Sequence, residues 1–326
     1  MPREVMENIY RIPVPLPNNP LRELNCYLIR GKDRSLLIDT GFRQEPCREA
    51  LFSGLRELDV HMEDTDVLLT HLHSDHTGLV SEVASPNSRV FIDDLDREWV
   101  QGSTRFELER QADEQFAKAG IAQEMLKQVT GTHPGRRFAT DPDFDQYVHL
   151  STGDVLEVGG YCLEAIQTPG HTPSHLCLWM AEQQTMFTGD HVLFDITPNI
   201  TCWPNLENSL GCYLESLKKV RDYDVKTALP AHRATGDFRA RVDELLDHHE
   251  YRLEECLKVV KANPGQLPLD IAGQMTWRIR AKNWEDFPIA QKWFAVGECM
   301  SHLDLLQVRG QVTKELRDGL LYYYPA

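Results

Sequence analysis

Residues 70–78 read THLHSDHTG, and this stretch decides the fold. Three imidazoles and one carboxylate fall within positions 71–76, directly after the apolar residues 67–69, which predict a buried strand ending in a loop. In an extended loop, His71 and His73 point one way, while Asp75 and His76 turn toward a second point. A histidine-rich surface loop is the alternative interpretation. The alternation of ligand residue types directly after a buried strand instead favours two neighbouring metal sites.

Three later segments also end a predicted strand with a candidate ligand. Residues 166–171 read IQTPGH, residues 187–190 read FTGD, and residues 225–232 end in LPAH. Together with residues 70–78, these segments resemble the metallo-β-lactamase fold hydrolases, whose HxHxDH signature is present at 71–76. The segments follow the family's order, and the resemblance covers roughly residues 9–235.

The resemblance implies a dinuclear metal centre. Carried over position by position, its ligands are His71, His73 and His171 for one metal, Asp75, His76 and His232 for the other, and Asp190 as the bridge. All these ligands are nitrogen or oxygen donors, so zinc is favoured, with iron or manganese as alternatives. Two adjacent cations would turn a bridging water into hydroxide at neutral pH. In this catalytic scheme Asp75 orients the hydroxide and Asp190 fixes the separation of the metals.

The predicted fold class is α/β, a four-layer αββα metallo-β-lactamase sandwich. The sequence predicts strands at 9–12, 25–29, 36–38 and 67–69, a helix at 46–60, hairpins at 155–166 and 176–187, a helix at 206–222 and a strand at 225–229. These elements place the catalytic domain at residues 1–236. A charged helical insertion at about 93–148 resembles the cap that covers the metal site in many family members. A solvated helical decoration is the alternative.

Residues 237–326 predict a small C-terminal helical domain. Long helical runs at 238–262 and 289–306 precede a hairpin whose strands, 311–315 and 320–324, flank a tight Asp-Gly turn. This order resembles the winged-helix tail found in the glyoxalase II-like and ribonuclease-like branch of the superfamily. The apolar face of the helix at 289–306 packs either within the chain or across a homodimer, and the sequence leaves both open.

Some residues near the ligand motifs have other interpretations. Arg233 follows His232 where the family more often has glycine, and a guanidinium recognises carboxylate or phosphate in a bidentate manner. Our hypothesis is that Arg233 binds an anionic part of the substrate; a surface ion pair is the alternative. We interpret Asp39 and His175 as either structural residues or outer partners of the ligands. His191 stays outside the ligand set, because neighbours on a loop seldom face the same ion.

Composition narrows the class of function. The formal net charge of -16 disfavours a nucleic-acid binder and attachment to anionic membranes. The N-terminal residues do not resemble a signal peptide. No apolar run approaches the ~20 residues that a membrane-spanning helix needs. We therefore expect a cytoplasmic protein. The eight cysteines contain no CxxC pair, which is typical of reduced thiols.

The sequence therefore predicts a hydrolase acting on a small acyl substrate, a thioester or a lactone. A phosphodiesterase or endoribonuclease is the second interpretation, so nucleic acid stays an open but less favoured partner. A β-lactam hydrolase is the third. A non-catalytic metal-bound binding module is a fourth, which the complete ligand set disfavours, because binding alone does not require two open metal positions.

Overall fold

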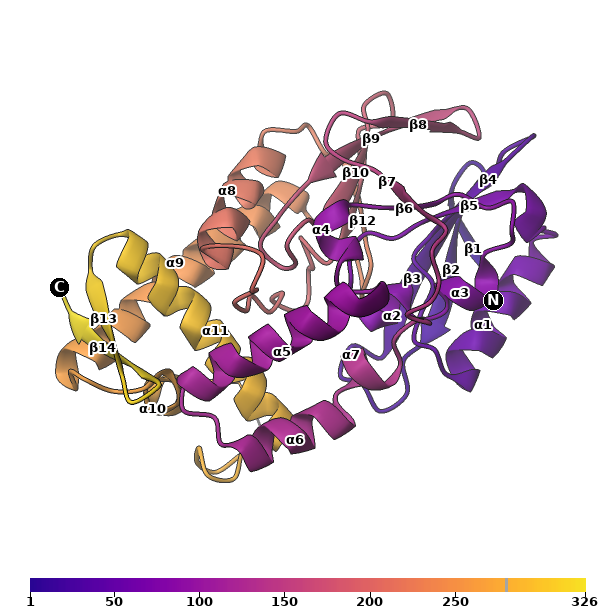
Figure 1. Ribbon diagram of the computed structural model, residues 1–326. Helices are drawn as coiled ribbons and strands as arrows, with labels where there is room; N and C mark the ends of the chain where they lie inside the picture. The colour runs from indigo at the N-terminus through magenta and orange to yellow at the C-terminus, as the bar shows by residue number, and fades with distance from the viewer. Residues whose placement is uncertain (279–280) are drawn as a thin grey trace.

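The computed structural model describes residues 1–278 and 281–326, and two β-sheets form its centre (Figure 1). The strands of the first sheet, in spatial order within these residues, are β1 (Arg3–Met6), β2 (Ile9–Pro15), β3 (Glu23–Ile29), β4 (Ser35–Ile38), β5 (Thr65–Leu68), β6 (Val90–Ile92) and β7 (Tyr147–His149). Those of the second are β12 (Thr227–Pro230), β11 (Thr185–Gly189), β10 (Leu176–Met180), β9 (Tyr161–Gln167) and β8 (Val155–Val158). The first sheet is antiparallel from β1 to β4 and parallel from β4 to β7.

Side-chain alternation along the strands builds the inner layers. In β10, Leu176, Leu178 and Met180 enter a buried cluster shared with the first sheet, whereas Cys177 and Trp179 enter the cluster on the opposite face. A strand with two apolar faces is covered on both sides. The two sheets therefore pack face to face, with helices outside each of them. The predicted four-layer αββα fold class is confirmed.

The helices form the outer layers, a helical insertion and a C-terminal region (Figure 1). Their bounds are α1 (Glu45–Glu57), α2 (Ser74–Thr77), α3 (Val80–Val83), α4 (Asp94–Arg97), α5 (Gly102–Lys118), α6 (Gln123–Thr132), α7 (Pro134–Arg137), α8 (Ser209–Arg221), α9 (Phe238–Ala262), α10 (Pro268–Gln274) and α11 (Ile289–Val308). Helix α1 covers the first sheet, and α8 and α9 contribute to the core outside the second. The insertion is helical from α4 to α7, and the chain then rejoins the first sheet at β7.

The C-terminal region ends in an antiparallel hairpin of β13 (Val312–Arg317) and β14 (Leu320–Pro325). Apolar residues of α11, such as Val296, Met300 and Leu303, belong to the core cluster that also contains residues of α8, α9 and the second sheet. This helix therefore packs within the chain, which was one of the two alternatives for its apolar face. The winged-helix resemblance and the domain boundary at 236 stay predictions. None of the helices within 1–278 and 281–326 has both the length and the apolar character that a membrane crossing demands.

Candidate metal centre

The candidate ligands lie where strands of both sheets end. His71 follows β5, His171 follows β9, Asp190 follows β11 and His232 follows β12. Backbone hydrogen bonds join these ends: Leu176 N donates to Thr70 O at 2.8 Å, and Ala231 N donates to Gly189 O at 3.0 Å. The ligand-bearing loops are therefore held side by side by the sheets themselves.

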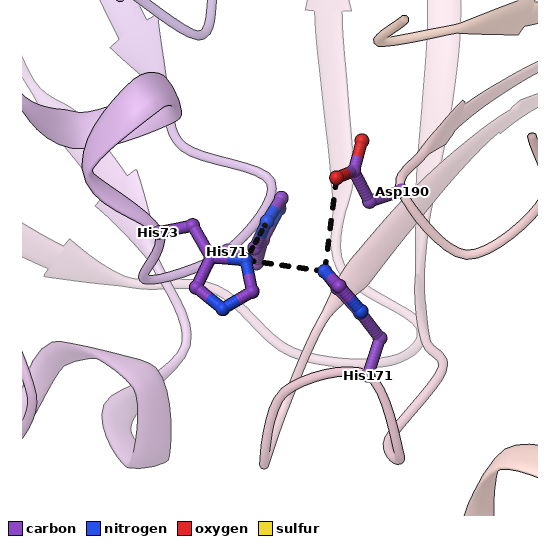
Figure 2. A group of neighbouring side chains, drawn as sticks. All are labelled: His71, His73, His171 and Asp190. Carbon is purple, nitrogen blue, oxygen red and sulfur yellow. Dashed lines mark hydrogen bonds and ion pairs between the residues drawn. The ribbon is translucent and has the colours of Figure 1, made fainter. Parts of the chain in front are cut away.

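Four of the predicted ligands converge as a first group, shown in Figure 2. His73 Nδ1 lies 3.0 Å from His71 Nε2 and 3.1 Å from His171 Nε2. Asp190 Oδ2 lies 3.7 Å from His171 Nε2. Two ligand atoms bound to one tetrahedral zinc are separated by about 3.3 Å, given Zn–N bonds of about 2.0–2.1 Å. The four side chains therefore have the spacing of a single metal site.

Asp75, His76 and His232 form a second group. Asp75 Oδ2 lies 3.3 Å from His232 Nε2 and 3.8 Å from His76 Nε2. The other oxygen of Asp190, Oδ1, lies 3.4 Å from His232 Nε2 and 3.7 Å from His76 Nε2. The Asp190 carboxylate thus presents one oxygen to each group, which is the geometry of a bridging ligand.

The polar atoms of the second group test whether a cation fits there. Within the described residues, His76 Nε2, His232 Nε2 and Asp190 Oδ1 are buried and have no hydrogen-bond partner. A buried polar atom without a partner costs about 1–3 kcal/mol. Three such atoms pointing at one another are explained by an ion that accepts their lone pairs. The residues present therefore fit divalent metal ions.

The remaining nitrogens of these histidines have partners that fix the orientation of each ring. His171 Nδ1 donates to the carbonyl of Asn199 at 2.9 Å, and His232 Nδ1 donates to the carbonyl of Glu23 at 2.8 Å. Because a carbonyl only accepts, Nδ1 of each ring carries a proton, and in the neutral ring Nε2 keeps the lone pair that a metal ion needs. His76 Nδ1 lies 2.8 Å from Asp39 Oδ2. Asp39 is therefore an outer partner of a candidate ligand.

Burial and neighbouring charges shift the pKa values of the two groups of candidate ligands in different directions. Burial and neighbouring imidazoles lower the pKa of His71 well below its ordinary value, and burial and His171 lower the pKa of His73 to about 3. Burial raises the pKa of Asp75, but the nearby His76 and His232 outweigh this effect and lower it to about 2. Neutral imidazoles and ionised carboxylates are the forms that bind metal ions. Burial also lowers the pKa of His76 and His232, but the nearby carboxylates outweigh this effect and raise the pKa of both. The second group therefore carries excess negative charge, which attracts a cation.

The other residues discussed from the sequence take different places. His175 Nε2 accepts a hydrogen bond from Asp190 N at 3.0 Å, so this histidine holds the backbone of Asp190 in place. His191 is buried against Tyr213 and belongs to neither group. The guanidinium of Arg233 donates to the carbonyl of Pro20. Its proposed role as a substrate anchor stays a prediction.

Sequence reasoning missed three residues that contact the ligand loops. Asp96, on α4, accepts hydrogen bonds from both the 71–73 and the 171–174 segments. Trp203 Nε1 donates to the carbonyl of His171 at 3.1 Å, and its ring lies 6.0 Å from that of His73. Asn199 supplies the carbonyl that orients His171. None of them stands in a recognisable motif, and the residue that directly follows the apolar run at 90–92 is Asp93, not Asp96.

Fold and site together define a class of metal-dependent hydrolases. The family model described as the metallo-beta-lactamase superfamily matches residues 20–232, which is most of the chain. This protein therefore belongs to the metallo-β-lactamase superfamily, and the resemblance inferred from the ligand motifs is confirmed.

Three proteins are similar to this chain over different shares of its length. The crystal structure of a beta-lactamase domain protein from Burkholderia ambifaria has a TM-score of 0.84 and 26% identity, over 100% of this chain and 94% of that one. Lactamase-like protein adaB of Aspergillus niger is 25% identical over 335 residues, covering 90% of this chain and 88% of its own. An atrochrysone carboxyl ACP thioesterase of Pseudocercospora fijiensis is 26% identical over 220 residues, 67% of this chain and 49% of its own.

Proposed function

We propose that this protein is a dinuclear metal-dependent hydrolase of a small acyl substrate, with a thioester as the first candidate and a lactone as the second. The observation that carries the proposal is the Asp190 carboxylate, which presents one oxygen to each group of buried ligands. The first ion would be held by His71, His73 and His171, and the second by Asp75, His76 and His232. Zinc is favoured by the imidazole-rich donor set, with iron and manganese as alternatives.

Two adjacent divalent ions, when bound, would supply Lewis acidity, which lowers the pKa of water and polarises a carbonyl oxygen. The protein's own side chains supply the rest. The Asp75 carboxylate, 3.3 Å from His232 Nε2, is an acceptor that can orient the attacking water by a hydrogen bond. Since no side-chain nucleophile of this chain is invoked, the reaction we propose is direct hydrolysis by water.

The aromatic surroundings of His73 support an acyl substrate. Trp203 lies beside His73 and packs edge-on against Trp99 at 4.9 Å. Both indole N–H groups donate to the protein, so the rings offer apolar faces rather than free donors. An apolar surface beside the candidate metal ligands suits an acyl group better than a phosphodiester. A phosphodiester is usually bound by lysine and arginine side chains. The relative from Pseudocercospora fijiensis, named a thioesterase, supports the same substrate class.

The test is release of free thiol from a panel of acyl thioesters by metal-loaded protein. An Asp190→Ala variant should lose about 10³-fold or more in kcat/KM, because it lacks the carboxylate that presents one oxygen to each group of ligands. The matched control is Asp243→Ala, which removes an exposed carboxylate paired with Arg221 and should keep full activity. Thioester hydrolysis that persists in the Asp190 variant would contradict the proposal. Two bound metals without thiol release, but with cleavage of a phosphodiester, would replace it with the second interpretation.

A further inference from the structure

The carboxylate of Asp96 lies between the two loops that carry the first group of candidate ligands. Asp96 is fully buried on the short helix α4, at the start of the helical insertion. It lies outside the ligand motifs at 70–78, 166–171, 187–190 and 225–232, and the proposed chemistry does not use it. Its contacts nevertheless reach both ligand loops.

Each carboxylate oxygen accepts two hydrogen bonds. Oδ2 accepts from Leu72 N at 2.9 Å and from Thr172 Oγ1 at 2.6 Å, so this one atom joins the two loops. Oδ1 accepts from Ser174 N at 2.8 Å and from Ser174 Oγ at 3.2 Å. Leu72 stands between His71 and His73, and Thr172 directly follows His171. The carboxylate therefore connects the two loops that carry the three histidines of the first group.

Helix α4 is itself fixed to the second loop. Asp96 N donates to Ser174 Oγ at 3.0 Å. Asp93, whose side chain caps α4 through Leu95 N, also accepts a hydrogen bond from the side chain of Gln167, the last residue of β9. The carboxylate of Asp96 thus sits on a support that cannot shift away from the His171 loop without breaking further contacts.

We propose that Asp96 is a positioning residue that sets the spacing of His71 and His73 relative to His171, and thereby the metal affinity of the first site. The assignment of these histidines as ligands rests on the proposed function. An ionised carboxylate is an acceptor at both oxygens, which suits four donors arriving from two loops. An amide at the same position accepts with one oxygen only, and its NH₂ group opposes the donors of the other loop.

The test compares Asp96→Asn with Asp66→Asn. Asp66 is a matched control, because it is also a buried aspartate with several hydrogen bonds, from Arg34 and Arg89, but it lies near the start of β5 and contacts no candidate ligand. The number of ions bound per chain and their affinities are measured by competition with a chelator, using Zn²⁺ and Co²⁺. The cobalt absorption spectrum reports the coordination geometry of each site.

We expect Asp96→Asn to lower the binding affinity for one of the two ions by about 10- to 100-fold, which is the usual effect of removing an outer partner of a ligand. The affinity for the other ion should equal that of the parent protein. Asp66→Asn should lower the melting temperature yet bind both ions as the parent does. Equal affinities for both ions in Asp96→Asn and the parent would overturn the proposal, as would an equal loss at both sites. If Asp96→Asn does not fold, Thr172→Val replaces it, because this variant removes one hydrogen-bond donor to Asp96 Oδ2. The same loss of affinity for one ion is then expected, and unchanged affinities for both ions would overturn the proposal.

Failure of this proposal is separable from failure of the proposed function. A parent protein that binds two ions but releases no thiol would reject the substrate class and leave the role of Asp96 intact. A parent that releases thiol, with an Asp96→Asn variant of unchanged metal affinity, would do the reverse.

Discussion

Histidine can bind a metal through either ring nitrogen, and the partner of the other nitrogen selects which one. His171 and His232 are oriented by backbone carbonyls, which are fixed by the fold. His76 is oriented instead by the carboxylate of Asp39 at 2.8 Å. Asp39 also accepts from Thr70 N at 2.8 Å, so it is held in place from the ligand loop. The metal affinity of the second site therefore depends on the charge of one side chain, Asp39.

Asp39→Asn should therefore weaken metal binding at the second site by about 10- to 100-fold. The backbone of Asp39 has a positive φ of 61°, which asparagine tolerates as well as aspartate does, so the variant isolates the loss of charge. Chelator competition measures the affinity. The cobalt spectrum of the ion that remains should differ from that of Asp96→Asn, because the two variants spare different sites. Identical spectra for the remaining ions would contradict this assignment.

At the scale of single residues, the sequence predicted the seven candidate ligands because they stand in motifs that follow strands. Their outer partners were harder to predict. Asp96 is separated from Leu72 and Thr172 by long stretches of chain, and no spacing rule connects them. Asn199 acts through its backbone carbonyl, a group that every residue possesses. Such partners are fixed by tertiary packing and leave no pattern in the sequence.

At the scale of elements, the turn that carries His171 depends on its contact with α8. Gly170 has a φ of +135°, and a Cβ placed on it would lie 2.4 Å from Tyr213 Cβ and 2.5 Å from Tyr213 Cα. Both atoms belong to the body of α8 and cannot rotate away. The close approach of the helix to this turn was visible only in the structure.

Gly170→Ala should lower the free energy of unfolding by about 2 to 4 kcal/mol, through backbone strain and the forced displacement of α8. Metal affinity should fall as well, because His171 follows directly. Gly153→Ala is the control, since Gly153 also has a positive φ, of 92°, but has open space around it. Denaturant unfolding and metal titration of both variants measure the effects. Equal losses of unfolding free energy and metal affinity in the two variants would show that the contact between Gly170 and α8 is not the cause.

The long helix at 238–262 and the short strands predicted at 36–38 and 67–69 are present in the structure, but two other short strands were not predicted. The helix predicted over 238–262 matches the bounds of α9 (Phe238–Ala262), and strands β8 and β9 form the hairpin predicted at 155–166. The three-residue strands β6 and β7 escaped prediction, because such short segments carry no measurable period. Their place beside β5 is set by parallel pairing with distant residues.

At the scale of the whole molecule, the C-terminal region is packed against the parts that form the site. Phe116 of α5 stacks on Trp293 of α11, with ring centroids 4.6 Å apart. Ser301 Oγ donates to the carbonyl of Ile200 at 2.7 Å, next to Asn199, whose carbonyl orients His171. The C-terminal helices therefore support both the insertion and the loop behind a candidate ligand.

This packing predicts that the chain unfolds as one cooperative unit. Leu253 and Leu303 of the C-terminal region share a core cluster with Leu217 of α8 and Met186 of β11, so a fragment ending at residue 236 would expose that apolar surface. Calorimetry of the full chain should show a single transition, and the 1–236 fragment should bind a hydrophobic dye and lose cooperative unfolding. A chain ending at residue 311 is the graded control, because it lacks only the hairpin, of which Val312 and Tyr323 enter the core. Two separate transitions in the full chain, or cooperative unfolding of the 1–236 fragment, would instead establish the boundary at 236 as a division between independently stable domains.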